Sequence, residues 1–113
     1  MIRQVYVAGA YTADTRTRTL QHISRALVAG CDLAKAGLHP IVPHTMGSHR
    51  ATWEQAMTRC RETIQGLDPA CDCLALLPGW EGSRGAVEER ALAESLGLPV
   101  MTVSEALVAS GGR

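Results

Sequence analysis

The sequence of 113 residues lacks the features that mark several broad classes of protein. No apolar run approaches the ~20 residues that a membrane-spanning helix needs. Acidic and basic residues balance to a formal net charge of zero, and the basic residues are spread along the chain. Proteins that bind nucleic-acid polymers or anionic membranes carry a clustered basic face. The sequence therefore predicts neither of these as a partner.

A targeting segment and a metal-binding cysteine pair are also lacking. The N-terminus leads directly into an expected strand, without the basic and then apolar segments of a secretory signal, so we expect a cytoplasmic protein. The four cysteines contain no C-x-x-C pair, and we interpret them as buried free thiols. His44 and His49 lie five residues apart in a loop with no third partner. No metal site and no cofactor is predicted.

Strand and helix patterns alternate along the chain, with no repeat or linker between them. Such alternation predicts a parallel sheet with helices on both faces. We expect residues 1–113 to form a single small three-layer α/β domain of the Rossmann or flavodoxin-like type, with four to five strands. Strands are predicted at residues 5–10, 38–43, 71–77 and 98–103, and helices at 17–36, 52–66, 84–97 and 104–109.

Several residues add detail to these elements. Pro40 and Pro43 favour an edge position for strand 38–43. Gly37 is expected to end the first helix, and Ser104 to cap the last one. Helix 17–36 has apolar residues at spacings of three and four, which predict one buried face: Leu20, Ile23, Leu27, Cys31 and Ala34.

In parallel α/β folds, ligands bind beyond the carboxyl ends of the strands, where the strand order reverses. This rule selects AGAYTADTR (8–16), PHTMGSHRATW (43–53) and PGWEGSRGA (78–86). These three segments are also the most unusual in composition. The fold and the composition therefore indicate the same end of the sheet.

Glu89 is the carboxylate that this pattern favours for chemistry. A helical side chain leans over the preceding turn, where Gly85 and Ala86 leave a bare patch. Neighbouring Glu88 has Arg84 four residues before it, which predicts an exposed ion pair of little energetic weight. The alternative is a plain capped helix that packs tightly on the sheet through Gly85, with an outward-facing glutamate.

The start of the same helix has the features of an anion site. Ser83 is a good N-cap, and the free N–H groups that follow it, with the helix dipole, suit a phosphate. Asp72 interrupts an apolar strand, so it is either a hydrogen-bonded structural acid or a site residue. Tyr6 lies in the first strand, and Gly9 ends that strand where the backbone approaches another group closely.

With these residues, the sequence resembles the nucleoside 2-deoxyribosyltransferase-like superfamily, and most of all its short, mostly uncharacterised bacterial and phage members. The similarity rests on VYVAGAYT (5–12), AKAGLHPIVPH (34–44) and CDCLALLPGWEGSRGAVEERALA (71–93). It reaches nearly the whole chain. Enzymes of this superfamily cleave or transfer the N-glycosidic bond of deoxynucleosides or their 5′-monophosphates.

The resemblance implies roles for individual residues. Glu89 falls on the glutamate that attacks the anomeric carbon, and Tyr6 on the tyrosine that hydrogen-bonds to it. Asp72 falls on an acid near the sugar and base that helps the base depart. Ser83 and Gly85 fall on the 5′-phosphate loop. The segment Gly9, Ala10 and Tyr11 lines the same pocket, and His44 and Trp80 complete the expected substrate-binding set.

The chain departs from the family pattern at two places. Ala10, Tyr11 and Thr12 replace the basic turn of the monophosphate hydrolases, and the loop 44–53, with His49, Arg50 and Trp53, does not match the characterised enzymes. The base specificity is therefore not transferred. Trp80 or Trp53 is either a stacking platform for the base or a packing residue. Arg16, Arg18 and Arg50 are either anion ligands or solvated surface residues.

Three hypotheses follow from the sequence. The first is an N-glycosidase or 2-deoxyribosyltransferase that acts on a small nucleoside or nucleotide. The second is a binding module that holds a nucleotide-like ligand without turning it over, and the third is a structural domain. We also expect a homodimer or a higher homo-oligomer, because related enzymes complete their pockets from a neighbouring subunit and a small sheet has edges to protect.

Overall fold

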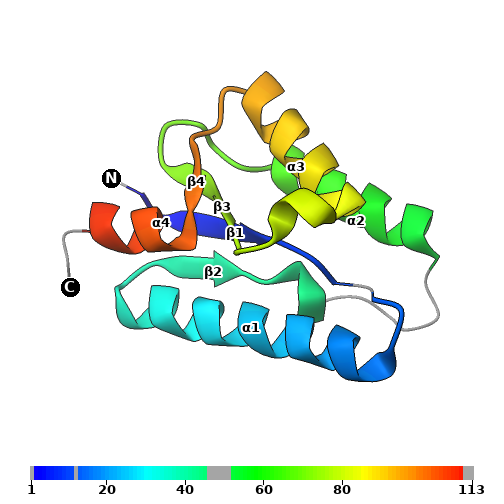
Figure 1. The fold of residues 1–113 in the computed structure, drawn as a ribbon. Coiled ribbons are helices and arrows are strands. Elements are labelled where there is room, and N and C mark those ends of the chain that lie inside the picture. Colours follow the sequence, from blue (N-terminus) through cyan, green and yellow to red (C-terminus); the bar gives the residue numbers. More distant parts are fainter. Residues whose placement is uncertain (1, 12, 46–51, 111–113) are drawn as a thin grey trace.

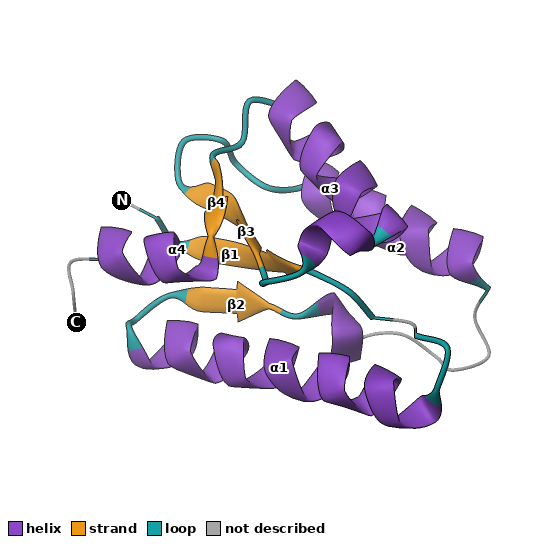
Figure 2. Cartoon of the chain, viewed as in Figure 1, coloured by secondary structure: helices purple, strands orange, loops and turns teal. Residues whose placement is uncertain are grey.

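The computed structural model of the chain describes residues 2–11, 13–45 and 52–110. The helices and strands alternate along this part of the chain (Figure 2). The strands are β1 (Gln4–Ala8), β2 (His39–Ile41), β3 (Asp72–Leu76) and β4 (Val100–Thr102). The helices are α1 (Arg16–Lys35), α2 (Trp53–Gln65), α3 (Arg84–Ser95) and α4 (Val103–Ala109), with two short 3-10 helices, η1 (Pro43–Thr45) and η2 (Trp80–Gly82).

The four strands form one parallel sheet in the order β2-β1-β3-β4. The predicted α/β class is therefore confirmed, and the topology is compatible with a small Rossmann or flavodoxin-like domain. Strand β2, which contains Pro40, lies at the edge as the prolines predict. None of the helices in the described ranges combines the length and the apolarity that a membrane crossing requires.

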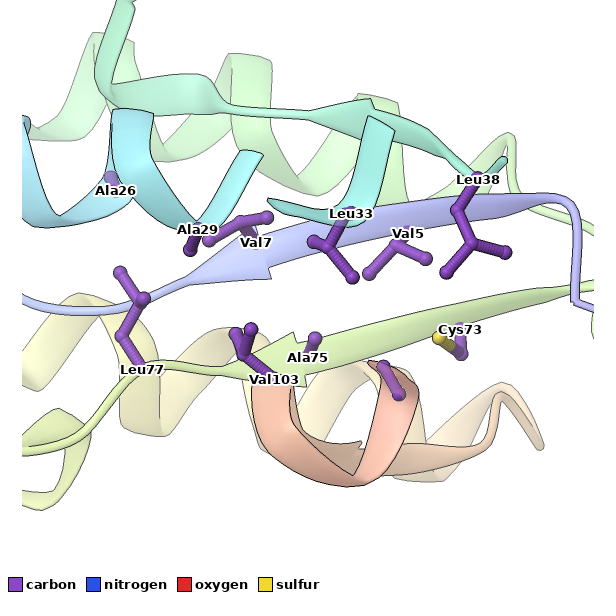
Figure 3. Close-up of a cluster of buried hydrophobic side chains, with 11 residues drawn as sticks. Val5, Val7, Ala26, Ala29, Leu33, Leu38, Cys73, Ala75, Leu77 and Val103 are labelled. Atoms are coloured by element: carbon purple, nitrogen blue, oxygen red, sulfur yellow. The ribbon is translucent and has the colours of Figure 1, made fainter. Parts of the chain in front are cut away.

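Helices cover both faces of the sheet and make a three-layer structure (Figure 1). On one face, α1 and α4 pack against Val5, Val7 and Ala75 (Figure 3). On the other face, α2 and α3 pack against Tyr6 and Leu74. Alternate residues of β1 and β3 point to opposite faces, and helices cover both faces, so every residue of these central strands is buried except the partly exposed Gln4.

The ends of the helices follow local sequence signals. Gly37 and Gly97 have φ of +88° and +77° directly after the C-caps of α1 and α3, a conformation that glycine adopts without strain. The prediction that Ser104 caps the last helix is wrong. Thr102 is the N-cap of α4, and it forms a capping box with Glu105.

Helix α1 corrects a second prediction from the sequence. Its buried residues are Ala26, Ala29, Gly30 and Leu33, whereas Leu20, Leu27 and Cys31 are exposed. The physical reason is close packing. A Cβ atom at Gly30 would lie 2.9 Å from a methyl carbon of Val42, so small residues bring this helix against β2. The larger apolar residues remain on the opposite side.

The strand order reverses between β1 and β3, and the chain packs tightly at that point. The Leu77 amide donates to the Ala8 carbonyl oxygen over 2.8 Å. A Cβ atom at Gly9 would lie 2.7 Å from the Leu77 side chain. Gly9 is therefore needed for the close approach that the sequence predicts, and Leu77 is its partner.

Candidate functional site

The centre of the candidate site is a hydrogen bond between two buried side chains from distant parts of the chain. The Tyr6 hydroxyl, from β1, donates to Oε2 of Glu89, from α3. Tyr6 is fully buried, and Glu89 is only 5% exposed. The bond that the resemblance implies is therefore present, and Glu89 points inward to the sheet rather than outward to solvent.

Burial controls the protonation of this pair. Desolvation raises the pKa of Glu89 to about 7, although hydrogen bonds from Tyr6 and Cys60 act in the opposite direction. Desolvation, with the nearby charge of Glu89, also raises the pKa of Tyr6 far above its ordinary value. Tyr6 therefore remains a hydrogen-bond donor at every physiological pH, while Glu89 changes its charge near neutrality.

Cys60 on α2 is a third member of this cluster, and the sequence analysis did not assign it to the site. Its side chain packs against the same buried cluster as Tyr6, and the thiol influences the pKa of both Tyr6 and Glu89. Burial raises the pKa of the thiol, so it carries no charge near neutral pH. The signal was its helical spacing from Met57 and Ile64, which are both buried.

The start of α3 has a structural role for each residue that was predicted to bind phosphate. The Ser83 hydroxyl is the N-cap and accepts from the Ala86 amide over 3.2 Å. A Cβ atom at Gly85 would lie 3.2 Å from the Met57 sulfur, so this glycine lets α2 pack against α3. The predicted tight packing through Gly85 is therefore present, with a helix rather than the sheet as the neighbour. Phosphate binding remains a prediction.

Trp53 and Trp80 each have the guanidinium group of an arginine over the indole ring. The Arg84 guanidinium lies 4.2 Å from the ring centroid of Trp53, and the Arg90 guanidinium lies 5.0 Å from that of Trp80. Trp80 also packs against the buried cluster of α2 and α3, which supports its interpretation as a packing residue. The predicted ion pair of Arg84 with Glu88 is present at 3.5 Å between partly exposed side chains.

Asp72 takes its hydrogen bonds from residues outside the Tyr6–Glu89 pair. Asp72 begins β3 and pairs with Gln4, at the amino end of the sheet. Its carboxylate accepts from the Gln4 amide at 3.1 Å and from the Asp68 amide at 2.8 Å, and Arg3 lies 3.7 Å away. Of the two roles left open by the sequence, the structure supports the hydrogen-bonded structural acid. Its place beside a substrate, which the resemblance implies, stays a prediction.

A second polar group lies beyond the carboxyl end of β1. Nε2 of His44, in η1, donates to the Ala10 carbonyl oxygen over 3.1 Å, and the His44 ring meets Tyr11 edge-on at 5.7 Å between centroids. Burial lowers the pKa of His44, so the ring is neutral and Nδ1 is an acceptor. Within the described ranges, this buried Nδ1 has no hydrogen-bond partner.

The remaining predictions concern metals and the loop after η1. Within residues 2–11, 13–45 and 52–110, no three His, Cys, Asp or Glu side chains come together in a way that could hold a metal ion. His49 and Arg50 lie outside the described residues. The cysteines of the described part are free thiols, but only Cys73 is buried and Cys31 is exposed, so the expectation of buried thiols holds for one position.

Comparison with known families assigns most of the chain to one group. The family model described as "Domain of unknown function (DUF4406)" matches residues 3–102. The match includes β1, the helices α1 to α3 and Glu89, so the chain belongs to this family. No curated protein matches the sequence.

Proposed function

We propose that this member of the DUF4406 family cleaves or transfers the N-glycosidic bond of a small nucleoside or nucleoside 5′-monophosphate, with Glu89 as the nucleophile. One observation carries the proposal. Glu89 is a buried carboxylate that accepts from the Tyr6 hydroxyl, next to the point where the strand order reverses. A carboxylate held in this way has a fixed direction and a tuned pKa, which are the two requirements for attack on a sugar carbon.

The chemistry of this pair proceeds in two steps. Glu89 in its ionised form attacks C1′ while the bond from C1′ to the base nitrogen breaks, and the base departs with the bonding electrons. The departing base takes a proton from water, because the Asp72 carboxylate is engaged by the Gln4 and Asp68 amides. Water then cleaves the glycosyl ester of Glu89, or a second base takes its place. These outcomes distinguish a hydrolase from a transferase.

The hydrogen bonds to Glu89 keep part of it ionised at neutral pH. An unassisted carboxylate at this depth would be protonated, and a protonated carboxyl group is a poor nucleophile. Tyr6 and Cys60 donate without bringing a positive charge, so they lower the cost of ionisation but leave the pKa at about 7. We therefore expect activity to rise with pH through neutrality.

His44 offers a means to recognise the ligand. Its neutral ring is fixed by the Ala10 carbonyl, which leaves the buried Nδ1 as an acceptor. A buried acceptor without a partner is costly, and a hydroxyl or amino group of a nucleoside would satisfy it. Because His44 and Tyr11 follow the carboxyl ends of neighbouring strands, they lie where ligands bind in this class of fold.

A nucleotide-binding module without turnover is the second candidate function, and one observation favours it. Glu89 is only 5% exposed, which limits the access of its carboxylate to a sugar carbon. In such a module, Glu89 would accept a hydrogen bond from the ligand without forming a bond to C1′. The module predicts thermal stabilisation by nucleotides, with no release of free base.

The proposal is tested by measuring free-base release from deoxy- and ribonucleosides and their 5′-monophosphates, with and without an acceptor base. The matched variants are Glu89→Gln, which keeps the shape of the side chain, and Glu88→Gln, its exposed neighbour. Release that needs Glu89 but not Glu88 would support the enzyme. Equal release by the parent and Glu89→Gln would overturn the nucleophile. A thermal shift without release would support the binding module.

A further inference from the structure

His44 carries a hydrogen-bond acceptor that the described part of the chain does not use. The side chain is only 7% exposed, although it lies in the short 3-10 helix η1 beyond the end of β2. Its buried Nδ1 has no hydrogen-bond partner among the residues that the structure describes. Buried polar atoms are almost always hydrogen-bonded in folded proteins, so an exception calls for an explanation. A ligand that brings its own donor to Nδ1 would explain it.

The contact between His44 and Ala10 fixes which ring nitrogen is the acceptor. The Ala10 carbonyl oxygen, 3.1 Å from Nε2, only accepts hydrogen bonds, so Nε2 carries a proton. In the neutral imidazole, Nδ1 then keeps a free lone pair. Burial favours this neutral form, because desolvation lowers the pKa of His44. Nδ1 is therefore an acceptor of fixed position that requires an N–H or O–H group.

Tyr11 supplies an aromatic surface beside this acceptor. Its ring is 43% exposed and meets the His44 ring edge-on. Its backbone carbonyl oxygen accepts from Nδ1 of His22 over 3.2 Å, so two histidines, from α1 and η1, hold the successive carbonyls of Ala10 and Tyr11. An exposed aromatic ring stacks on a nucleobase of any kind. A flat base with a donor at its edge suits this surface and acceptor better than a sugar does.

The positions of His44 and Glu89 in the fold agree with a base at His44. Strand β1 lies between β2 and β3 in the sheet, η1 follows β2, and α3 follows β3. Figure 1 shows α3 and β2 on either side of β1. In a displacement at C1′, the attacking group and the departing base occupy opposite faces of the sugar. With the sugar at Glu89, the base extends away from α3 and toward the end of β2, where His44 lies.

We propose that His44 and Tyr11 form the subsite for the base, and that Nδ1 of His44 accepts a hydrogen bond from an exocyclic amino group of that base. The ligand is then a nucleoside or nucleotide of an amino-bearing base, such as adenine, guanine or cytosine. In uracil, a carbonyl oxygen would face the lone pair in place of the amino group. This inference rests on the proposed function, because it takes the ligand to be a nucleoside with its sugar at Glu89.

The first test compares the affinities of bases that differ at the amino group. The pairs are adenine and purine, guanine and hypoxanthine, and cytosine and uracil, supplied as 2′-deoxynucleosides and as their 5′-monophosphates. A Glu89→Gln protein keeps the ligands intact during calorimetry. In at least one pair, the member with the amino group should bind roughly tenfold or more tightly. Equal affinities within every pair, or no binding by any of these ligands, would overturn the proposal.

A variant of His44 tests whether this residue reads the amino group. In His44→Gln, the amide nitrogen takes the place of Nε2 and donates to the Ala10 carbonyl, but no atom replaces Nδ1. The preference for the amino-bearing ligand should therefore disappear. His39→Gln, at an exposed histidine at the start of β2, is the matched control and should keep the preference. A preference that persists in His44→Gln would assign the recognition to another group and overturn the proposal.

NMR applies even if His44→Gln fails to fold. The ¹⁵N resonance of an unprotonated imidazole nitrogen moves when that nitrogen accepts a hydrogen bond. In Glu89→Gln protein with ¹⁵N-labelled histidine, the Nδ1 resonance of His44 should shift with the preferred amino-bearing ligand. The other member of the pair, at saturation, should leave it in place. Equal shifts with both ligands would contradict the proposed hydrogen bond.

The combined results separate the base subsite from the chemistry of Glu89. An affinity that depends on both the amino group and His44, without release of free base by the parent, would retain the subsite and reject the nucleophile. Release of free base at equal rates from both members of every pair would retain the nucleophile and reject the subsite.

Discussion

Asp72 and Glu89 are both buried carboxylates on the side of the sheet that α2 and α3 cover, yet their surroundings give them opposite properties. Asp72 accepts from the backbone amides of Gln4 and Asp68, and Arg3 lies nearby. These contacts lower its pKa even though burial acts to raise it. Glu89 receives hydrogen bonds from side chains that carry no positive charge, and burial raises its pKa to about 7.

The difference between the two acids comes from the donors that surround each carboxylate. Backbone amides at the amino end of the sheet donate to the Asp72 carboxylate and favour its charged form, so Asp72 is ionised at neutral pH. These hydrogen bonds also join the segment before β3 to β1. Glu89 faces a phenol and a thiol that leave its charge adjustable. A group whose charge adjusts near neutrality is suited to chemistry, whereas one that is permanently satisfied is suited to stability.

The largest expected effect is on turnover. If the proposed function holds, Glu89→Gln should lower the rate of base release by roughly a thousandfold or more, because the nucleophile is removed. Asp72→Asn should change the rate of base release by the folded protein by less than about tenfold, since the Asp72 carboxylate contacts Arg3, Gln4 and Asp68 and not Glu89. If both variants are folded by circular dichroism and lose the same fraction of the rate of base release, Asp72 takes part in the reaction.

The second effect is on the free energy of unfolding, where the substitution at Asp72 should have the larger effect and that at Glu89 the smaller. Asp72→Asn should lower the free energy of unfolding by about 1–3 kcal/mol, because an amide nitrogen would face the Gln4 or Asp68 amide. Glu89→Gln should be neutral or stabilising at pH 8, because it removes the cost of a buried charge. Urea unfolding of both variants measures the difference. A more stable Asp72→Asn would contradict the structural role.

The third prediction is a pH dependence of the difference between the parent and Glu89→Gln. The pKa of Glu89 is raised from 4.5 to about 7 by folding, so the folded state binds more protons than the unfolded state between these values. The free energy of unfolding of the parent should therefore fall, relative to Glu89→Gln, by about 3 kcal/mol as the pH rises through this window. Taking the difference cancels the opposite contribution of His44, whose pKa is lowered by burial. A flat difference would exclude the raised pKa.

The smallest effect separates the two donors to Glu89. Tyr6→Phe removes the first donor and should raise the pKa of Glu89 by about one unit, a typical value for one lost hydrogen bond. Cys60→Ala should give a smaller rise. NMR of the ¹³C-labelled Glu89 carboxyl group measures both without requiring turnover. If Cys60→Ala gives the larger shift, the thiol is the dominant donor.

Local patterns in the sequence predict much of the fold. The alternation of strands and helices, the edge position of the strand with Pro40, and the helix ends at Gly37 and Gly97 all follow from nearest-neighbour chemistry. The bare turn formed by Gly85 and Ala86 also predicts that Glu89 lies on a buried surface. Ser104 failed as a cap because Thr102, two residues earlier, had an equally good hydroxyl and a better partner in Glu105.

Tertiary packing decides what these patterns leave open. The sequence could not tell which apolar stripe of α1 faces the sheet, because that choice depends on how closely Gly30 and Val42 approach. Nor could it place Cys60 near Glu89, since the contact between α2 and α3 depends on both helices packing on the same face of the sheet. Partners that are distant in the chain are invisible to local spacing.

Asp72 and Glu89 show which properties follow from the sequence and which depend on the tertiary structure. The sequence by itself determined that Asp72 and Glu89 are carboxylates within apolar elements of a parallel α/β domain, because hydrophobic periodicity and turn residues act over a few positions. Only the tertiary structure decided their charge states, because a pKa depends on burial and on donors brought in from other elements. Asp72 meets backbone amides, and Glu89 meets Tyr6 from a strand 83 positions away in the chain.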